Sequence, residues 1–214
     1  LDPSPPARSR LHFGCGSHRI QGWLNVDLRG SDDDVDLAAG KLPWPDGAFE
    51  TAVGRQVIEH FDLTTELLPL LRELRRVLRH DGELWVSCPD IEKICRSFLD
   101  HGMENLMEDR LRRQPEYSLG DVPVSHLIND LFHQGGEHRN LFDFALLTWA
   151  LEKSGFQQIT RTSEPEFLAR FPEFPPRRDE QQSLYVCARP TLLPSVTMPA
   201  ARAERRALRA FVKP

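Results

Sequence analysis

Two glycines and an aspartate form the clearest chemical signal in the chain. Gly14 and Gly16 follow the short apolar run 11–13, and Asp27 ends the next apolar run at 24–27. Glycine has no Cβ, so a Gly-x-Gly turn lets the backbone bend tightly and come close to a ligand. A carboxylate that closes the neighbouring strand can accept both hydroxyl groups of a ribose. The pattern therefore predicts a nucleoside-binding edge.

Two common phosphate-binding motifs are missing from this edge. The third glycine of a dinucleotide fingerprint would stand at position 19, which is Arg19. The chain also contains no Gly-x-x-x-x-Gly-Lys-Ser/Thr motif. These absences disfavour a pyrophosphate cradle and a nucleoside triphosphate loop.

Hydrophobic patterning predicts the elements that position this edge. Leucine and valine recur at intervals of three and four from Leu67 to Leu78, which predicts an amphipathic helix with Pro69 in its first turn and Gly82 as its C-terminal cap. We expect the acidic run 32–34 to be a solvated loop. Short apolar runs between turn residues predict strands at 10–13, 24–27, 35–37, 49–54, 83–88, 157–162 and 183–189.

A second helix is marked at both ends. Asp143 is a good N-cap residue, Phe142 can pack against Leu147, and Gly155 can end the helix. Residues 91–140 show mixed helical pieces and no strand pattern. We therefore expect them to form an inserted cap.

Motifs downstream of Asp27 follow one another in a recognisable order. They are VDL at 35–37, LPWPDGAFE at 42–50, QVIEHF at 56–61 and LRRVLRHDGELWVS at 74–87. Together with the glycine turn, they resemble the class I S-adenosylmethionine-dependent methyltransferases, in particular the type 11-like, short-core subgroup. The chain departs from that pattern at His80-Asp81, where the family usually has Lys-Pro. The short stretch from Gly16 to Asp27 leaves little or no room for a first helix.

The resemblance implies an α/β fold. Expected is a Rossmann-like, seven-stranded, mostly parallel sheet with helices on both faces, a shortened first crossover and a helical cap inserted after the fifth strand. The chain would then divide into a flexible lead at 1–9, a methyltransferase domain at 10–190 with its cap at 91–140, and a C-terminal extension at 191–214. A helix is expected at 196–211.

The cofactor implied by the resemblance is S-adenosylmethionine. Its ribose needs a hydrogen-bond acceptor, its adenine needs a slot between side chains, and its sulfonium needs a backbone that approaches closely. In an open parallel sheet, groups that bind a ligand in this way lie at the carboxyl ends of the strands. Asp36 and Leu37 are expected to line the adenine slot, and Arg55 and Gln56 to cross the same crevice. The expected cofactor-binding residues are Phe13, Gly14, Cys15, Gly16, Asp27, Leu28, Asp36, Leu37, Arg55 and Gln56.

The segment after the fourth strand bears on the methyl acceptor. Methyltransferases of amino groups on bases or glutamine carry Asp/Asn-Pro-Pro-Tyr/Phe there, whereas this chain has GRQVI at 54–58. We therefore expect a small-molecule acceptor, methylated at oxygen by in-line SN2 transfer. Such a transfer needs precise positioning and, for a hydroxyl acceptor, a general base.

Histidines are the natural candidates for that base. The cap carries His126, His133 and His138. His138 and Glu137 belong to the glycine-hinged polar loop 134–140, whose Gly-x-His segment resembles that of relatives in this subgroup, and we expect these two residues to be catalytic. We expect His60 to be structural. The cap histidines are spaced by seven and five, which does not place them on one helical face, so no metal site is expected.

Composition narrows the class of protein and its partners. The net charge of −5 gives no basic excess for nucleic acid, and no apolar run approaches the ~20 residues of a membrane span. Four cysteines without a Cys-x-x-Cys motif favour reduced thiols and a cytoplasmic protein. Two alternatives to a methyltransferase stay open: a non-catalytic S-adenosylmethionine- or nucleoside-binding protein, and an NAD(P)-dependent oxidoreductase. The sequence predicts no particular oligomeric state.

Overall fold

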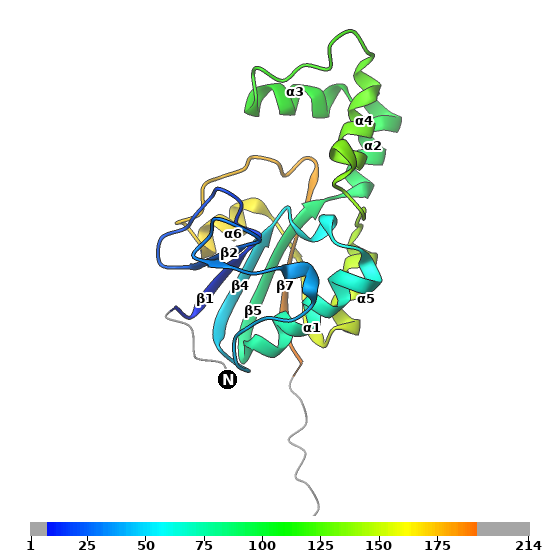
Figure 1. Ribbon diagram of the computed structural model, residues 1–214. Coiled ribbons are helices and arrows are strands. Elements are labelled where there is room, and N and C mark those ends of the chain that lie inside the picture. The colour runs from blue at the N-terminus through cyan, green and yellow to red at the C-terminus, as the bar shows by residue number, and fades with distance from the viewer. Residues whose placement is uncertain (1–7, 192–214) are drawn as a thin grey trace, which may run out of the picture.

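A seven-stranded sheet forms the centre of the computed structural model, which describes residues 8–191 (Figure 1). The strand order is β3-β2-β1-β4-β5-β7-β6, and only β7 is antiparallel to its neighbours. The expected Rossmann-like, mostly parallel sheet is confirmed. The strands are β1 (Arg10–Phe13), β2 (Leu24–Asp27), β3 (Asp33–Asp34), β4 (Phe49–Arg55), β5 (Leu78–Pro89), β6 (Phe156–Thr162) and β7 (Ser183–Pro190).

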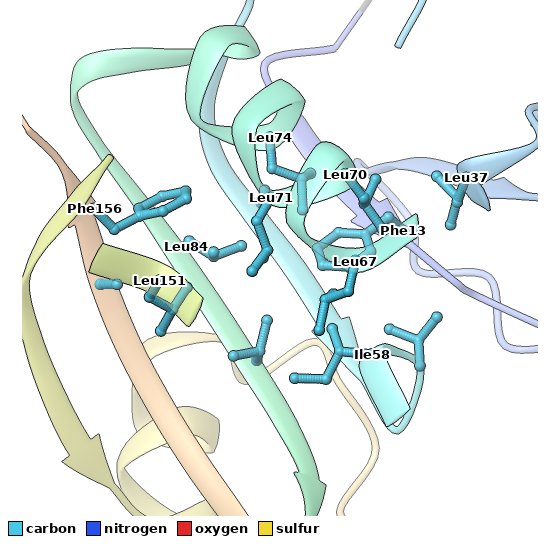
Figure 2. Packing of buried hydrophobic residues seen from close by; sticks show 14 of the residues in the cluster. Phe13, Leu37, Ile58, Leu67, Leu70, Leu71, Leu74, Leu84, Leu151 and Phe156 are labelled. Atoms are coloured by element: carbon cyan, nitrogen blue, oxygen red, sulfur yellow. The ribbon is translucent and has the colours of Figure 1, made fainter. Parts of the chain in front are cut away.

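One face of the sheet carries the main hydrophobic core. Helices α1 (Leu68–Val77) and α5 (Phe144–Lys153) pack on this face, and Leu70, Leu71 and Leu74 of α1 are fully buried against it (Figure 2). Pro69 lies in the first turn of α1, as predicted, after a π turn at Leu63–Leu67. The amphipathic pattern therefore located this helix correctly.

The end of α1 differs from the prediction. The chain leaves the helix at Leu78 and enters β5 at once, since Leu78 pairs with Phe49 of β4. Gly82 therefore lies inside β5 and is not a helix cap. A Cβ at this position would lie 3.0 Å from the carbonyl oxygens of Arg79 and Glu50, so close approach of backbones explains the glycine.

The third strand was also placed wrongly. Residues 35–37 do not form a strand, because the Asp36 carboxylate accepts from the Ala38 N–H and starts a 3-10 turn at Leu37–Ala39. Instead, Asp33–Asp34 pairs with the end of β2, and Asp32 accepts from the backbone N–H of Asn25 at 3.0 Å. The acidic run is therefore exposed to solvent, as expected, but it forms a short strand and not a loop.

The first crossover contains no helix, in agreement with the prediction. The other face of the sheet is covered instead by α6 (Glu164–Arg170) and by the segment that follows it, which lie between β6 and β7 (Figure 1). Trp23 lies edge-on to Phe171 and Phe174, with ring centroids 5.4 and 5.0 Å apart. An aromatic cluster from α6 and the segment that follows it thus replaces the missing helix.

The cap follows β5 and stands beyond the carboxyl ends of the strands (Figure 1). It consists of α2 (Ile91–His101), α3 (Glu104–Arg113), a 3-10 turn at Val124–His126, α4 (Leu127–His133) and a second 3-10 turn at Gln134–Gly136. A small core of its own holds it together, formed by Ile94, Met103, Leu106, Leu127 and Leu131. The predicted helical insertion is confirmed.

The signals at the start of α5 are confirmed as well. The Asp143 carboxylate accepts from the Leu146 N–H at 2.7 Å, Phe142 and Leu147 are fully buried in the main core, and Gly155 follows the helix with φ +89°. The predicted lead falls mostly outside the described residues, and the predicted helix at 196–211 falls entirely outside them. Within residues 8–191, no helix has the length and apolar character needed to cross a membrane.

Candidate active site

A cleft of about 810 Å³ opens at the carboxyl ends of β1, β4 and β5, beneath the cap. Its walls come from four parts of the chain: the glycine turn, the end of β4, the cap, and the connection between α6 and β7. Among the residues that line the cleft are Gly14, Gly16, Arg55, Gln56, His60 and His138. Segments distant in sequence therefore converge where ligands of open parallel sheets bind.

The two glycines of the turn have different roles. Gly14 has φ +63°, and a Cβ there would lie 2.2 Å from Cγ2 of Val57, so the protein itself requires this glycine. Gly16 has φ +53° and nothing within 4 Å of a Cβ position, so its open side is available to a ligand. Phe13 is fully buried beneath Gly54 and supports the turn without facing the cleft.

Cys15 lines the cleft with its backbone and is otherwise buried. Its N–H donates to the Val26 carbonyl at 3.1 Å, which ties the turn to β2. Burial raises the pKa of the Cys15 thiol, so the sulfur remains protonated and unreactive. The residue acts as a small apolar spacer in the turn.

The Asp27 carboxylate is fixed by two backbone donors. The Gly16 N–H donates to Oδ2 and the Leu28 N–H to Oδ1, each at 2.7 Å. Each oxygen keeps a further lone-pair site, so the group is oriented and can still accept two hydroxyls. Leu28 beside it is 57% exposed, an apolar surface suited to the face of an adenine. The edge therefore fits an adenosine group.

Asp36 and Leu37 contribute less than the sequence suggested. The Asp36 side chain caps the following turn, and the Leu37 side chain is buried in the main core (Figure 2). The Leu37 side chain is therefore unavailable to a ligand, and only the backbone of this segment can line an adenine slot.

Arg55 presents an unpaired guanidinium to the cleft. It stacks on Phe174 and Phe167 at 4.9 and 5.3 Å, donates from Nη1 to the Pro175 carbonyl at 2.9 Å, and has a buried Nε without a partner. Burial, and then the nearby charge of Arg177, lower the pKa of Arg55.

The other arginines that line the cleft each pair with a carboxylate: Arg110 with Asp130, Arg113 with Asp109, and Arg177 with Asp179. Arg55 pairs with none among residues 8–191, so it is the cation of the cleft that can meet an incoming anion. Gln56 beside it is held with φ +55° and donates from Nε2 to Ser183 Oγ at 3.1 Å.

His138 reaches the cleft with a defined proton state. Its Nδ1 lies 2.9 Å from the Leu131 carbonyl, and because a carbonyl only accepts, Nδ1 must carry the hydrogen. Nε2 therefore holds a lone pair, and it is buried without a partner. Burial lowers the pKa of His138, which keeps the ring neutral and the lone pair free at neutral pH.

His60 and Glu59 lie beside His138. The rings of His60 and His138 are 5.0 Å apart, and His60 Nδ1 lies 3.2 Å from the Glu137 carbonyl. Glu59 is fully buried, neither carboxylate oxygen has a partner, and burial raises its pKa to about 8. Side-chain ligand atoms of these three residues all lie within 4.8 Å of one another.

The cap does not assemble the other predicted residues. Glu137, His126 and His133 have exposed side chains outside the lining of the cleft. Sequence reasoning missed Glu59, although a glutamate directly after the apolar pair Val57-Ile58 is an available signal. It also missed His12, whose side chain lines the cleft and bonds to Asn25 at 3.1 Å.

Comparison with known proteins agrees with this geometry. A family model described as a methyltransferase domain matches residues 26–86, and no curated protein matches the sequence. An S-adenosylmethionine-dependent methyltransferase from Thermotoga maritima is 16% identical with a TM-score of 0.50, over 87% of this chain and 84% of that chain. A chain of the complex between the Haloferax volcanii Trm112 methyltransferase activator and a methyltransferase is 11% identical with a TM-score of 0.51, over 90% of this chain and 86% of that chain. At these identities the structural likeness is one of fold.

Proposed function

Because this chain belongs to the class I S-adenosylmethionine-dependent methyltransferase superfamily, we propose that it methylates a hydroxyl oxygen of a small molecule. The enzyme is a methyltransferase and S-adenosylmethionine is its cofactor, which supplies an electrophilic methyl group. Asp27, the open backbone at Gly16 and the exposed Leu28 fit its adenosine part. Superfamily membership disfavours the NAD(P)-dependent oxidoreductase considered above.

One observation carries the proposal for oxygen. His138 lines the cleft that also contains Gly14 and Gly16, and its buried Nε2 has a lone pair and no partner. A hydroxyl is a weak nucleophile until its proton is removed or its O–H bond is polarised, and a positioned group that does so contributes typically 10²–10⁴-fold. We assign this activation of the hydroxyl to His138.

Arg55 supports an acceptor that carries an anionic group. The Nε of Arg55 is buried without an acceptor, which is unfavourable, and Arg55 lacks the carboxylate that its neighbours have. A carboxylate or phosphate on the acceptor would supply it. The acceptor would then be held at Arg55 and activated at His138.

The test is a methyl-transfer assay with a panel of small hydroxy acids and their amine analogues. We expect O-methylated products, identified by mass and by stability to base. His138→Ala should lower turnover about 10²–10⁴-fold, with unchanged affinity for S-adenosylhomocysteine, the demethylated product. Glu137→Ala is the matched control, because Glu137 is exposed and should leave turnover unchanged. Methylation of the amines alone would contradict the proposal.

A further inference from the structure

We propose that Glu59, His60 and His138 form a site for one divalent transition-metal ion, with Zn²⁺ as the best fit. The three side chains offer one carboxylate oxygen and two imidazole nitrogens within 4.8 Å of one another. In a tetrahedral zinc site with bonds of about 2.1 Å, ligand atoms lie about 3.4 Å apart, so adjustments of about 1 Å close the site.

The hydrogen bonds behind both histidines have the arrangement of a metal site. Nδ1 of His60 faces the Glu137 carbonyl at 3.2 Å, and Nδ1 of His138 faces the Leu131 carbonyl at 2.9 Å. Histidines that bind metals usually donate their other N–H to a carbonyl or carboxylate, which fixes the tautomer and the orientation of the ring. Both Nε2 atoms are thereby left with a lone pair that a metal ion can use.

Glu59 needs a partner that the described chain does not provide. Its side chain is fully buried, with an exposure of 0%. Neither carboxylate oxygen has a hydrogen-bond partner within residues 8–191. An unpaired buried carboxylate is strongly unfavourable. A bound cation removes that penalty and also uses the unpaired Nε2 of His138. One ion therefore accounts for all the unpaired ligand atoms of this cluster.

The two segments that carry the ligands are fastened to each other. The N–H groups of Arg139 and Asn140 donate to the Glu59 carbonyl at 2.8 and 3.1 Å, and Asn140 Nδ2 donates to the Phe61 carbonyl. His138 is therefore held beside Glu59 and His60 by the backbone. A site built in this way is largely preformed, which favours metal binding.

The donor set selects the class of metal. Mg²⁺ and Ca²⁺ prefer oxygen ligands, whereas two imidazoles and one carboxylate suit Zn²⁺ and its first-row neighbours. Two histidines and a glutamate also match catalytic zinc sites, which keep a fourth position open. His60 and His138 line the cleft, so the open position would face the acceptor.

The chemical role rests on the proposed function. A hydroxyl bound at the open position would lose its proton to water in the cleft more readily, because the cation stabilises the resulting alkoxide. The O–H electron pair remains on the oxygen. His138 would then activate the hydroxyl as a ligand of the metal, since its Nε2 lone pair is engaged.

Metal binding can be tested without any acceptor. The full chain is stripped with a chelator, dialysed and titrated with ZnCl₂ by calorimetry, and with CoCl₂ by visible absorption. We expect one ion per chain and a tetrahedral or five-coordinate cobalt spectrum. Glu59→Gln, His60→Gln and His138→Gln should each weaken Zn²⁺ binding about 100-fold or more. His126→Gln and His133→Gln are controls, because these histidines are exposed in the cap and should bind as the parent does.

Folding is checked by the affinity of each variant for S-adenosylhomocysteine, which should stay unchanged because the cofactor edge lies at Asp27 and Gly16. Absence of Zn²⁺ and Co²⁺ binding by the folded parent overturns the site, and so does binding that the three ligand substitutions leave unaltered. Full O-methylation by the metal-free enzyme overturns the catalytic role while leaving the proposed function intact. Metal binding together with methylation of amines alone supports the site and refutes only the proposed function.

Discussion

Replacement of Asp27 by alanine tests the cofactor edge most directly. In the parent, Gly16 and Leu28 hold the two carboxylate oxygens, each at 2.7 Å, and leave lone pairs for two ribose hydroxyls. A hydrogen bond to a charged group contributes about 1.5–3 kcal/mol net, and two bonds to one carboxylate are not fully additive. We expect Asp27→Ala to lose about 2–3 kcal/mol of binding free energy, or roughly 30- to 150-fold in affinity.

Asp27→Asn separates the effect of charge from that of shape. An amide has only one acceptor oxygen, so its NH₂ group must face the N–H of either Gly16 or Leu28. The turn can no longer satisfy both donors, and the side chain must rotate. We therefore expect the asparagine variant to bind the cofactor no better than the alanine variant, although it is nearly isosteric with aspartate.

The assay is calorimetric titration with S-adenosylhomocysteine. Asp33→Ala is the matched control, because Asp33 is an exposed carboxylate in the adjacent strand. Circular dichroism and thermal melting verify that each variant is folded. Binding by folded Asp27→Ala within about twofold of the parent would refute the assignment, since a twofold change corresponds to only about 0.4 kcal/mol.

Four further results are expected. Gly16→Val should fold yet lose S-adenosylhomocysteine binding, whereas Gly14→Val should lower the melting temperature sharply because its Cβ meets Val57; normal binding by Gly16→Val would place the ligand elsewhere. Arg55→Gln should raise KM for an anionic acceptor about 10- to 150-fold; a loss of cofactor affinity instead would assign Arg55 to the methionine carboxylate. Amide exchange at 135–136 should slow when S-adenosylhomocysteine is added, because we expect the loop 134–140 to close over the cofactor. The amides of 139–140 already donate to the Glu59 carbonyl and should exchange slowly with or without the ligand. Unchanged rates at 135–136 would argue against closure of this loop. Burial lowers the pKa of His12 to about 4, below its unfolded value of 6.5, so its contribution to stability is present above pH 6.5 and is lost as the pH falls toward 4. In urea unfolding, the free energy of unfolding of His12→Gln should therefore fall less steeply than that of the parent over this range. An identical fall in both proteins would show that His12 is not the source of the pH dependence.

The sequence alone was enough to predict those helices whose boundaries are set by residues of their own segment. Asp143 caps α5 through its own side chain, and the leucines of α1 record the burial of one helix face. A strand was predicted at 35–37, but the Asp36 carboxylate caps a 3-10 turn there, so this prediction was wrong. The strand that replaces it, Asp33–Asp34, consists of two exposed acidic residues, and only pairing with β2 explains it.

The cluster of Glu59, His60 and His138 was predictable only in part. His138 could be singled out by its loop, but its neighbours Glu59 and His60 lie 79 and 78 positions earlier (138 − 59 and 138 − 60). They meet because the backbone N–H groups of residues 139 and 140 donate to the Glu59 carbonyl. Almost every residue has such a backbone N–H group, so these hydrogen bonds cannot be predicted from the residue types. The set therefore joins the 3-10 turn Ile58–His60, which follows β4, to the cap.

The replacement of the first crossover helix has a consequence for biosynthesis. Trp23 donates to Glu173 across 150 positions and packs on Phe171 and Phe174, so the outer face of the early strands is covered only by residues far later in the chain. Contacts of such long sequence separation form late, because the entropy of closing the loop must be overcome first. On the ribosome, β1 and β2 would emerge with Trp23 exposed to water until the segment 171–174 has been made. The strands that carry the cofactor edge would therefore gain the packing of their outer face only after that segment has followed them.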